Sequence, residues 1–109
     1  MEQRKHFRRF TAVNIDCVSA QYADDVDKCL MANISRGGLA LESRKLYVPG
    51  DKLSVTFPSL DGQNISVGVE ILHMAPGGFG TLYGARYDEP DLNKMANFNQ
   101  YLLKNFNLY

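Results

Sequence analysis

Two short polar stretches hold the residues best suited to bind a ligand. Asn33 and Ser35 carry a carboxamide and a hydroxyl two residues apart, just before a pair of glycines. Residues two apart lie on the same face of an extended strand, so both side chains would offer hydrogen bonds together. The other stretch combines four basic residues with a histidine: Arg4, Lys5, His6, Arg8 and Arg9. An arginine fork binds phosphate bidentately or stacks on a base, which suits a ligand rich in phosphate and hydrogen-bonding edges.

Each stretch also has a plain structural interpretation. Asn and Ser often bond to nearby backbone, and glycine permits tight turns, so residues 33–38 are also typical of a connection between strands. Charged residues near a chain end are usually solvated. Taken one at a time, the two stretches leave both interpretations open.

The charge is balanced overall but unevenly placed. The chain has 109 residues, of which 12 are basic and 12 acidic, and this zero net charge disfavours wholesale binding to a nucleic acid polymer or an anionic membrane. Residues 1–10 hold four basic groups against one acid, whereas residues 16–27 hold four aspartates and no base. A basic arm on a neutral body indicates a local anion site. The length favours one domain over residues 1–109.

Other chemistries find little support in the residue pattern. No apolar run reaches the ~18 residues of a membrane span and no signal peptide is evident, so we expect no membrane span and a cytoplasmic location. Cys17 and Cys29 form no CxxC pair and have no histidine nearby, so no metal or cofactor is expected. Ser35 lacks the glycine that precedes the serine of a nucleophile elbow, and the glycine-rich residues 77–80 lie between strands. We therefore expect no catalytic residue and no enzyme.

Alternating apolar and polar residues predict short antiparallel strands, as in a small barrel or sandwich. The inward sides of the first two strands consist of Val13, Ile15 and Cys17, then Leu30, Ala32 and Ile34. On this register Asn33 and Ser35 face outward. Cys17 points inward and Cys29 outward, so a disulfide between them would require a bulge.

Four later strands and one helix complete the pattern. The strands are expected around residues 39–41, 53–57, 65–71 and 81–87. Residues 88–90 offer acidic caps and a proline suited to the first helical position, which predicts a helix over residues 90–106. Its apolar stripe, most simply a lid over an open barrel end, consists of Leu92, Met95, Phe98, Leu102, Leu103 and Phe106.

Arg4-x-x-x-Arg8 followed by Asn33-x-Ser35-x-x-Gly38 resembles the two-part signature of PilZ domains, RxxxR and then [D/N]xSxxG. Each half is short, but both occur in order inside the expected strand pattern. The resemblance covers nearly the whole chain and implies an all-β fold with one helix, a six-stranded antiparallel PilZ-like β-barrel with a C-terminal α-helix. It divides the chain into a basic N-terminal arm at 1–9, the barrel at 10–88 and the helix at 90–106.

The resemblance also implies a receptor for cyclic di-GMP. The two arginines of the family motif clamp guanine and phosphate groups, which assigns that role to Arg4 and Arg8. Asn33 and Ser35 would hydrogen-bond a guanine edge or a phosphate, and Gly38 would let the backbone bend around the base. The family more often has aspartate where this chain has Asn33, but asparagine keeps an acceptor and adds a donor. Binding would rearrange the basic arm and relay the signal to a protein effector.

Three alternatives remain open at this point. Lys5 and Arg9 fit the same spacing, although lysine lacks the planar fork of arginine. Arg36 and Gly37 fill the free positions of the second motif, and Arg36 could add a phosphate contact. The alternative function is a PilZ-like adaptor that binds no nucleotide and acts only through protein contacts.

Two polar residues of the later strands complete the predictions. Some members of the family stack on guanine a side chain near the end of the strand expected at residues 65–71. His73 follows that strand here and is therefore a further ligand candidate. However, it shares the parity of Ile71, which favours a core or barrel-rim histidine. Symmetric folding of the hairpin places Arg86 opposite Glu70 and predicts a cross-strand ion pair. Residues 84–87 also resemble the final strand of the family.

Overall fold

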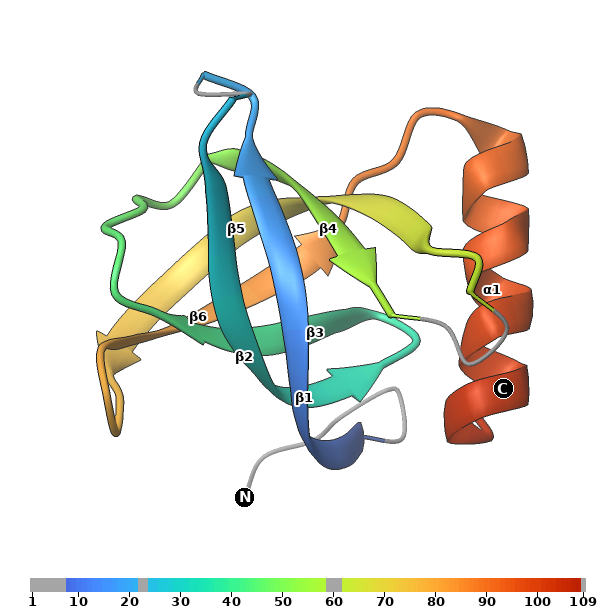
Figure 1. Ribbon diagram of the computed structural model, residues 1–109, viewed down its shortest axis with the longest axis horizontal. Helices are drawn as coiled ribbons and strands as arrows, with labels where there is room; N and C mark the ends of the chain where they lie inside the picture. The colour runs from blue at the N-terminus through green and yellow to red at the C-terminus, as the bar shows by residue number, and fades with distance from the viewer. Residues whose placement is uncertain (1–7, 22–23, 59–61, 109) are drawn as a thin grey trace.

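The computed structural model describes residues 8–21, 24–58 and 62–108. Within these residues, six strands and one helix follow one another along the chain (Figure 1). They are β1 (Arg8–Ser19), β2 (Val26–Ser35), β3 (Gly38–Ser43), β4 (Lys52–Phe57), β5 (Ile65–Pro76), β6 (Thr81–Tyr87) and α1 (Leu92–Phe106).

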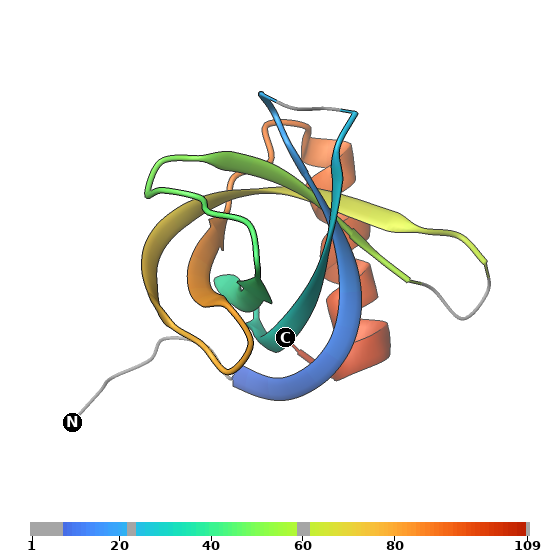
Figure 2. The ribbon, with the colours of Figure 1, turned by 60° about the vertical axis from the view of Figure 1, so that its left-hand side comes forward.

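The strands close into an antiparallel barrel in the order β1-β2-β3-β6-β5-β4. Figure 2 looks into the ring of strands, with α1 behind it. Closure pairs β3 with β6 and β1 with β4, so every strand of the barrel is hydrogen-bonded to a neighbour on both sides over part of its length. The predicted six-stranded antiparallel barrel with a C-terminal helix is confirmed.

The barrel core comes from the inward residues of the predicted alternation. In β4, Leu53, Val55 and Phe57 are buried, and in β5 the same holds for Val67 and Val69. Each such side chain stabilises the fold by about 1.5–3 kcal/mol relative to exposure. The turn predicted at residues 77–80 joins β5 to β6, where the Gly77 amide donates to the Gly80 carbonyl at 2.9 Å.

A β-bulge corrects the predicted inward face of β2. The register shifts between Met31 and Asn33, so the residues before the shift have the opposite parity to those after it. Cys29 and Met31 are therefore buried, whereas Leu30 and Ala32, which were expected inward, are only half-buried. A sequence register counted back from the motif is wrong for every residue before the bulge.

Both cysteines consequently lie inside the barrel, contrary to the outward position predicted for Cys29. Cys17 and Cys29 are 0% and 2% exposed, and both are free thiols. The neighbouring Cys17 thiol and burial raise the pKa of Cys29. The two cysteines are therefore poorly reactive core residues.

The helix begins at Leu92, two residues later than predicted, because its cap is Asp91 and not an acid of residues 88–90. The Asp91 carboxylate accepts from the Asn93 and Lys94 amides at 2.9 and 3.2 Å. Phe98 and Leu102 are buried against the barrel end, but Leu92 and Leu103 are exposed and do not belong to the packed stripe. α1 packs across one open end of the barrel, as predicted (Figure 2). No helix among the described residues is long and apolar enough to cross a membrane.

Candidate functional site

The β1–β2 ladder brings the two polar stretches of the sequence together. Arg8 pairs with Ser35 and Arg9 with Ile34. β1 thus begins at Arg8, two residues earlier than predicted, and takes Arg8 and Arg9 out of the expected arm. The remaining predicted basic residues, Arg4 and Lys5, lie outside the described residues, as does His6.

Ser35 forms the turn that connects β2 to β3. Its hydroxyl donates to the Gly38 carbonyl and accepts from the Gly37 and Gly38 amides, each at 3.2 Å. A hydroxyl has one donor and two acceptor sites, so all three are in use. Ser35 is 6% exposed and does not face outward as predicted, because its side chain folds back onto its own turn.

Asn33 holds the one buried side-chain oxygen or nitrogen without a hydrogen bond that is found among the described residues. Its Oδ1 atom is inaccessible to solvent and has no partner, although the residue as a whole is half-buried. Leaving a buried acceptor unpaired costs about 1–3 kcal/mol. Such an atom marks a position where a ligand with a hydrogen-bond donor would add stability.

Gly38 has a structural reason to be glycine. It pairs with Arg86 on β6, and a Cβ atom there would lie 2.2 Å from the Ala85 carbonyl oxygen. Any side chain would therefore force β3 away from β6. The close approach of β3 to β6 therefore holds the β2–β3 turn in position beside the start of β1.

Tyr87 is a site residue that sequence reasoning missed. Its hydroxyl donates to the carbonyls of Ser35 and Gly38 at 2.5 and 3.2 Å, and its ring packs edge-on against Phe98 of α1 at 4.9 Å. Burial raises the pKa of Tyr87, so the hydroxyl stays protonated and remains a donor. One side chain therefore joins the Ser35–Gly38 turn to the helix.

A row of alternating charges crosses the sheet beside this turn. Arg86 bonds to Glu70 with an Nη2–Oε1 distance of 2.6 Å, which confirms the predicted cross-strand pair. Glu70 also lies 3.8 Å from Lys52, whose ammonium bonds to Asp88. That bond raises the pKa of Lys52 and lowers the pKa of Asp88. Arg86 is thus already paired and half of its side chain is exposed.

The remaining predicted residues lie apart or at the rim. Arg36 and Gly37 are exposed at the tip of the β2–β3 turn. His73 is exposed and lies over Gly84, because a second bulge between Ile71 and His73 turns it out of the barrel. The core position that the parity of Ile71 favoured for His73 is therefore wrong.

A second polar cluster lies inside the barrel and is structural. The Asp27 carboxylate accepts from the Ser43 hydroxyl at 2.5 Å, the Tyr47 hydroxyl at 2.6 Å and the Cys29 thiol at 3.2 Å. Tyr83 ties the adjoining loop by donating to the Lys45 carbonyl at 2.8 Å. All donors of this cluster are satisfied from within, and no group of metal-ligating side chains occurs in the described part of the chain.

The fold is a small closed barrel whose polar β2–β3 turn is linked through Tyr87 to the C-terminal helix. The profile of the PilZ domain family matches residues 2–104. The chain belongs to the PilZ family. No curated protein sequence matches it.

Solved structures agree in fold at low sequence identity. The PilZ domain of CeSA from a cellulose-synthesizing bacterium is 16% identical, with a TM-score of 0.68 over 90% of this chain and 96% of that one. The PilZ domain of Escherichia coli YcgR, solved with cyclic di-GMP, is 10% identical, with a TM-score of 0.68 over 94% of this chain and 91% of that one. Bacillus subtilis MotI, an inhibitor of motility, is 14% identical, with a TM-score of 0.69 over 95% of this chain. This chain spans about half of MotI, because the match covers 51% of that protein.

Proposed function

We propose that this protein binds cyclic di-GMP at the β1–β2 ladder and the β2–β3 turn, and that it acts as a receptor and not as an enzyme. Arg4 and Arg8 would hold guanine and phosphate groups, and Asn33 would bind a guanine edge. The proposal rests on family membership and on one observation above all. The backbone pairing of Arg8 with Ser35 sets the two halves of the signature side by side.

The pairing also supports the Arg4 and Arg8 register over Lys5 and Arg9. Partners in a strand ladder share a face of the sheet, and neighbours along a strand alternate. Arg8 is opposite Ser35 at the turn, whereas Arg9 is opposite Ile34, which is fully buried in the core. Of the two positions, the backbone at Arg8 is therefore the one that pairs with the first residue of the turn.

Asn33 supports a nucleobase as the ligand. Its buried Oδ1 atom lacks a donor, and a guanine edge offers an N–H donor for this oxygen beside a carbonyl oxygen that can accept from the carboxamide NH2. Ser35 has no free hydrogen-bonding site, so its proposed role is to hold the turn in shape. Gly38 serves the same purpose by allowing β3 to approach β6 closely.

We further propose that the bound nucleotide rearranges the N-terminal arm and thereby changes the surface offered to a protein effector. A dianionic ligand would offset the mutual repulsion of the basic groups in residues 4–9. Limited trypsin digestion tests this step. Saturating cyclic di-GMP is expected to slow cleavage after Arg4 and Lys5 and to leave cleavage after Lys104 unchanged. Equal cleavage rates with and without nucleotide would contradict it.

Isothermal titration of the purified protein with cyclic di-GMP tests the binding itself. Arg8→Ala and Asn33→Ala are expected to weaken binding by about 1.5–3 kcal/mol and about 1–2 kcal/mol, the ranges for charged and neutral hydrogen bonds. Lys28→Gln is the matched control, since Lys28 is exposed and its ion pair within the described part of the chain is with Asp16. Loss of binding in Arg9→Ala with a silent Arg8→Ala would shift the register by one. No saturable binding at tens of micromolar would favour the adaptor, which acts only through protein contacts.

A further inference from the structure

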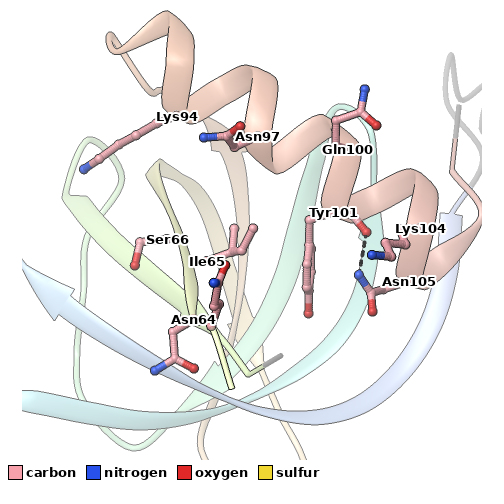
Figure 3. Close-up of a pocket in the computed structure, with 10 residues that line it drawn as sticks. Asn64, Ile65, Ser66, Lys94, Asn97, Gln100, Tyr101, Lys104 and Asn105 are labelled. Carbon is pink, nitrogen blue, oxygen red and sulfur yellow. Dashed lines mark hydrogen bonds between the residues drawn. The ribbon is translucent and has the colours of Figure 1, made fainter. Parts of the chain in front are cut away.

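A polar groove separates α1 from the segment that leads into β5. Its volume is about 840 Å³, and it opens to solvent (Figure 3). One wall is the helix, with Lys94, Asn97 and Tyr101, and the other is the segment that leads into β5, with Asn64. None of the described residues of the proposed nucleotide site lines it.

The helical wall presents one continuous row of side chains. Lys94, Asn97, Tyr101 and Lys104 follow one another at steps of three, four and three residues, so they lie on the same side of the helix. A helix rises about 1.5 Å per residue, which sets the two lysines about 15 Å apart along its axis. The row therefore carries one cation at each end and a carboxamide between them.

The described lining of the groove is cationic. It contains Lys94 and Lys104 and no acidic residue, and no Asp or Glu occurs between positions 92 and 106. Neither lysine forms an ion pair with another described residue. Both ammonium groups are consequently available for a negatively charged occupant.

The groove also offers unused amide groups. The carboxamides of Asn64, Asn97 and Gln100 form no hydrogen bond with other residues in the described ranges. Tyr101, by contrast, is 7% exposed and donates to the Pro58 carbonyl at 3.0 Å, so its ring and hydroxyl belong to the fold. Free carboxamides supply both a donor and an acceptor, the combination that a peptide backbone requires.

We propose that this groove binds an extended acidic segment of a partner protein, with two carboxylates four or five residues apart. An extended chain advances about 3.3 Å per residue, so such a spacing covers the roughly 15 Å between Lys94 and Lys104. A single phosphate or carboxylate reaches only one lysine. A nucleic acid strand gains its affinity from many cations and from exposed stacking rings, and this groove has two cations and no exposed ring.

The inference rests on the part of the proposed function in which a protein effector receives the signal, but it does not require nucleotide binding. The test uses the intact chain labelled with ¹⁵N and a series of synthetic peptides. Each peptide is built from Ser and Gly and carries two Glu residues at a separation of one to eight positions. Titrations followed by amide chemical shifts at low salt report both affinity and location.

The expected result is strongest binding at separations of four and five, with shifts concentrated on Asn64, Lys94, Asn97 and Lys104. Lys94→Gln and Lys104→Gln should each weaken binding about two- to fivefold, as exposed ion pairs do. Lys28→Gln, an exposed lysine on β2, should leave it unchanged. Binding should also weaken as salt screens the charges.

Three results would overturn the proposal. They are affinity that depends only on peptide charge and not on spacing, shifts spread over other basic surfaces, and groove shifts produced by an oligothymidylate but not by any peptide. Cyclic di-GMP affinity measured on the same lysine variants separates the two proposals. Weaker peptide binding with an unchanged nucleotide affinity would show that the groove is a separate site, and spacing-dependent peptide binding without any nucleotide binding would contradict only the proposed function.

Discussion

Tyr87→Phe is the substitution that best tests how the β2–β3 turn is held in place. The Tyr87 hydroxyl is bonded to the Ser35 and Gly38 carbonyls, and the ring packs on Phe98. Phenylalanine keeps the ring contact and removes only the hydroxyl. The Ser35 carbonyl then loses this donor, while the Gly38 carbonyl keeps its bond from the Ser35 hydroxyl, and an unsatisfied buried group costs about 1–3 kcal/mol. We expect a loss of about 1–2 kcal/mol, because water can reach part of the turn.

Urea unfolding measures this loss, and Tyr101→Phe provides the matched control. Tyr101 also donates one hydrogen bond, to the Pro58 carbonyl at 3.0 Å, but it does not touch the turn. Both variants should be less stable, with an unchanged slope against urea. Only Tyr87→Phe should also weaken cyclic di-GMP binding, since only that change loosens the turn. Equal nucleotide affinity in both variants, or a stability loss below about 0.5 kcal/mol for Tyr87→Phe, would refute this account of the hydroxyl.

Three further predictions concern stability. Gly38→Ala should cost more than about 2 kcal/mol in urea unfolding, because its Cβ would lie 2.2 Å from the Ala85 carbonyl, whereas Gly78→Ala, with no atom closer than 3.8 Å, should cost little. Asp91→Ala should lower stability by about 1 kcal/mol through loss of the helix cap, and Asp91→Asn should restore most of it. The raised pKa values of Tyr47, Tyr87 and Tyr101 mean that the unfolded chain loses these protons first. Stability should therefore be full below the ordinary tyrosine value of about 10 and fall as pH rises above it, less steeply in Tyr87→Phe; a flat profile to pH 11 would contradict this.

The sequence predicted the fold well because its alternation is local and strong. The inward residues of β4 and β5 follow directly from their period of two, and the Glu70–Arg86 pair follows from hairpin symmetry. The predictions for Cys29 and His73 are wrong for one shared reason. Each is separated from the residues used to set its parity by a bulge, near Ala32 in β2 and near Leu72 in β5. A single extra residue reverses which side chains of the strand point inward beyond the bulge. No residue type in these strands predicts that a bulge is present.

The candidate site was predicted only in part because its contacts join distant segments. The motif residues were found from their spacing, but the satisfied hydroxyl of Ser35 and the unpaired oxygen of Asn33 depend on how the turn folds. Tyr87 reaches the turn from a strand about 50 positions away in sequence, a contact created by closure of β3 on β6. The groove likewise depends on tertiary packing, because its lysines and Asn64 line one pocket only when the helix lies against the barrel.

The helix gives the two proposed sites a common support. Phe98 contacts the Tyr87 ring at 4.9 Å and the Tyr101 ring at 6.2 Å, so one aromatic row runs from the Ser35–Gly38 turn to the wall of the groove. Nucleotide binding and peptide binding are coupled only when both ligands favour the same arrangement of this aromatic row. Such coupling is reciprocal. If the nucleotide raises the affinity for the acidic peptide by some factor, the peptide must raise the affinity for the nucleotide by the same factor. Tyr87→Phe should reduce that factor in both directions, because it removes the hydroxyl that bonds the row to the turn while leaving the lysines of the groove untouched.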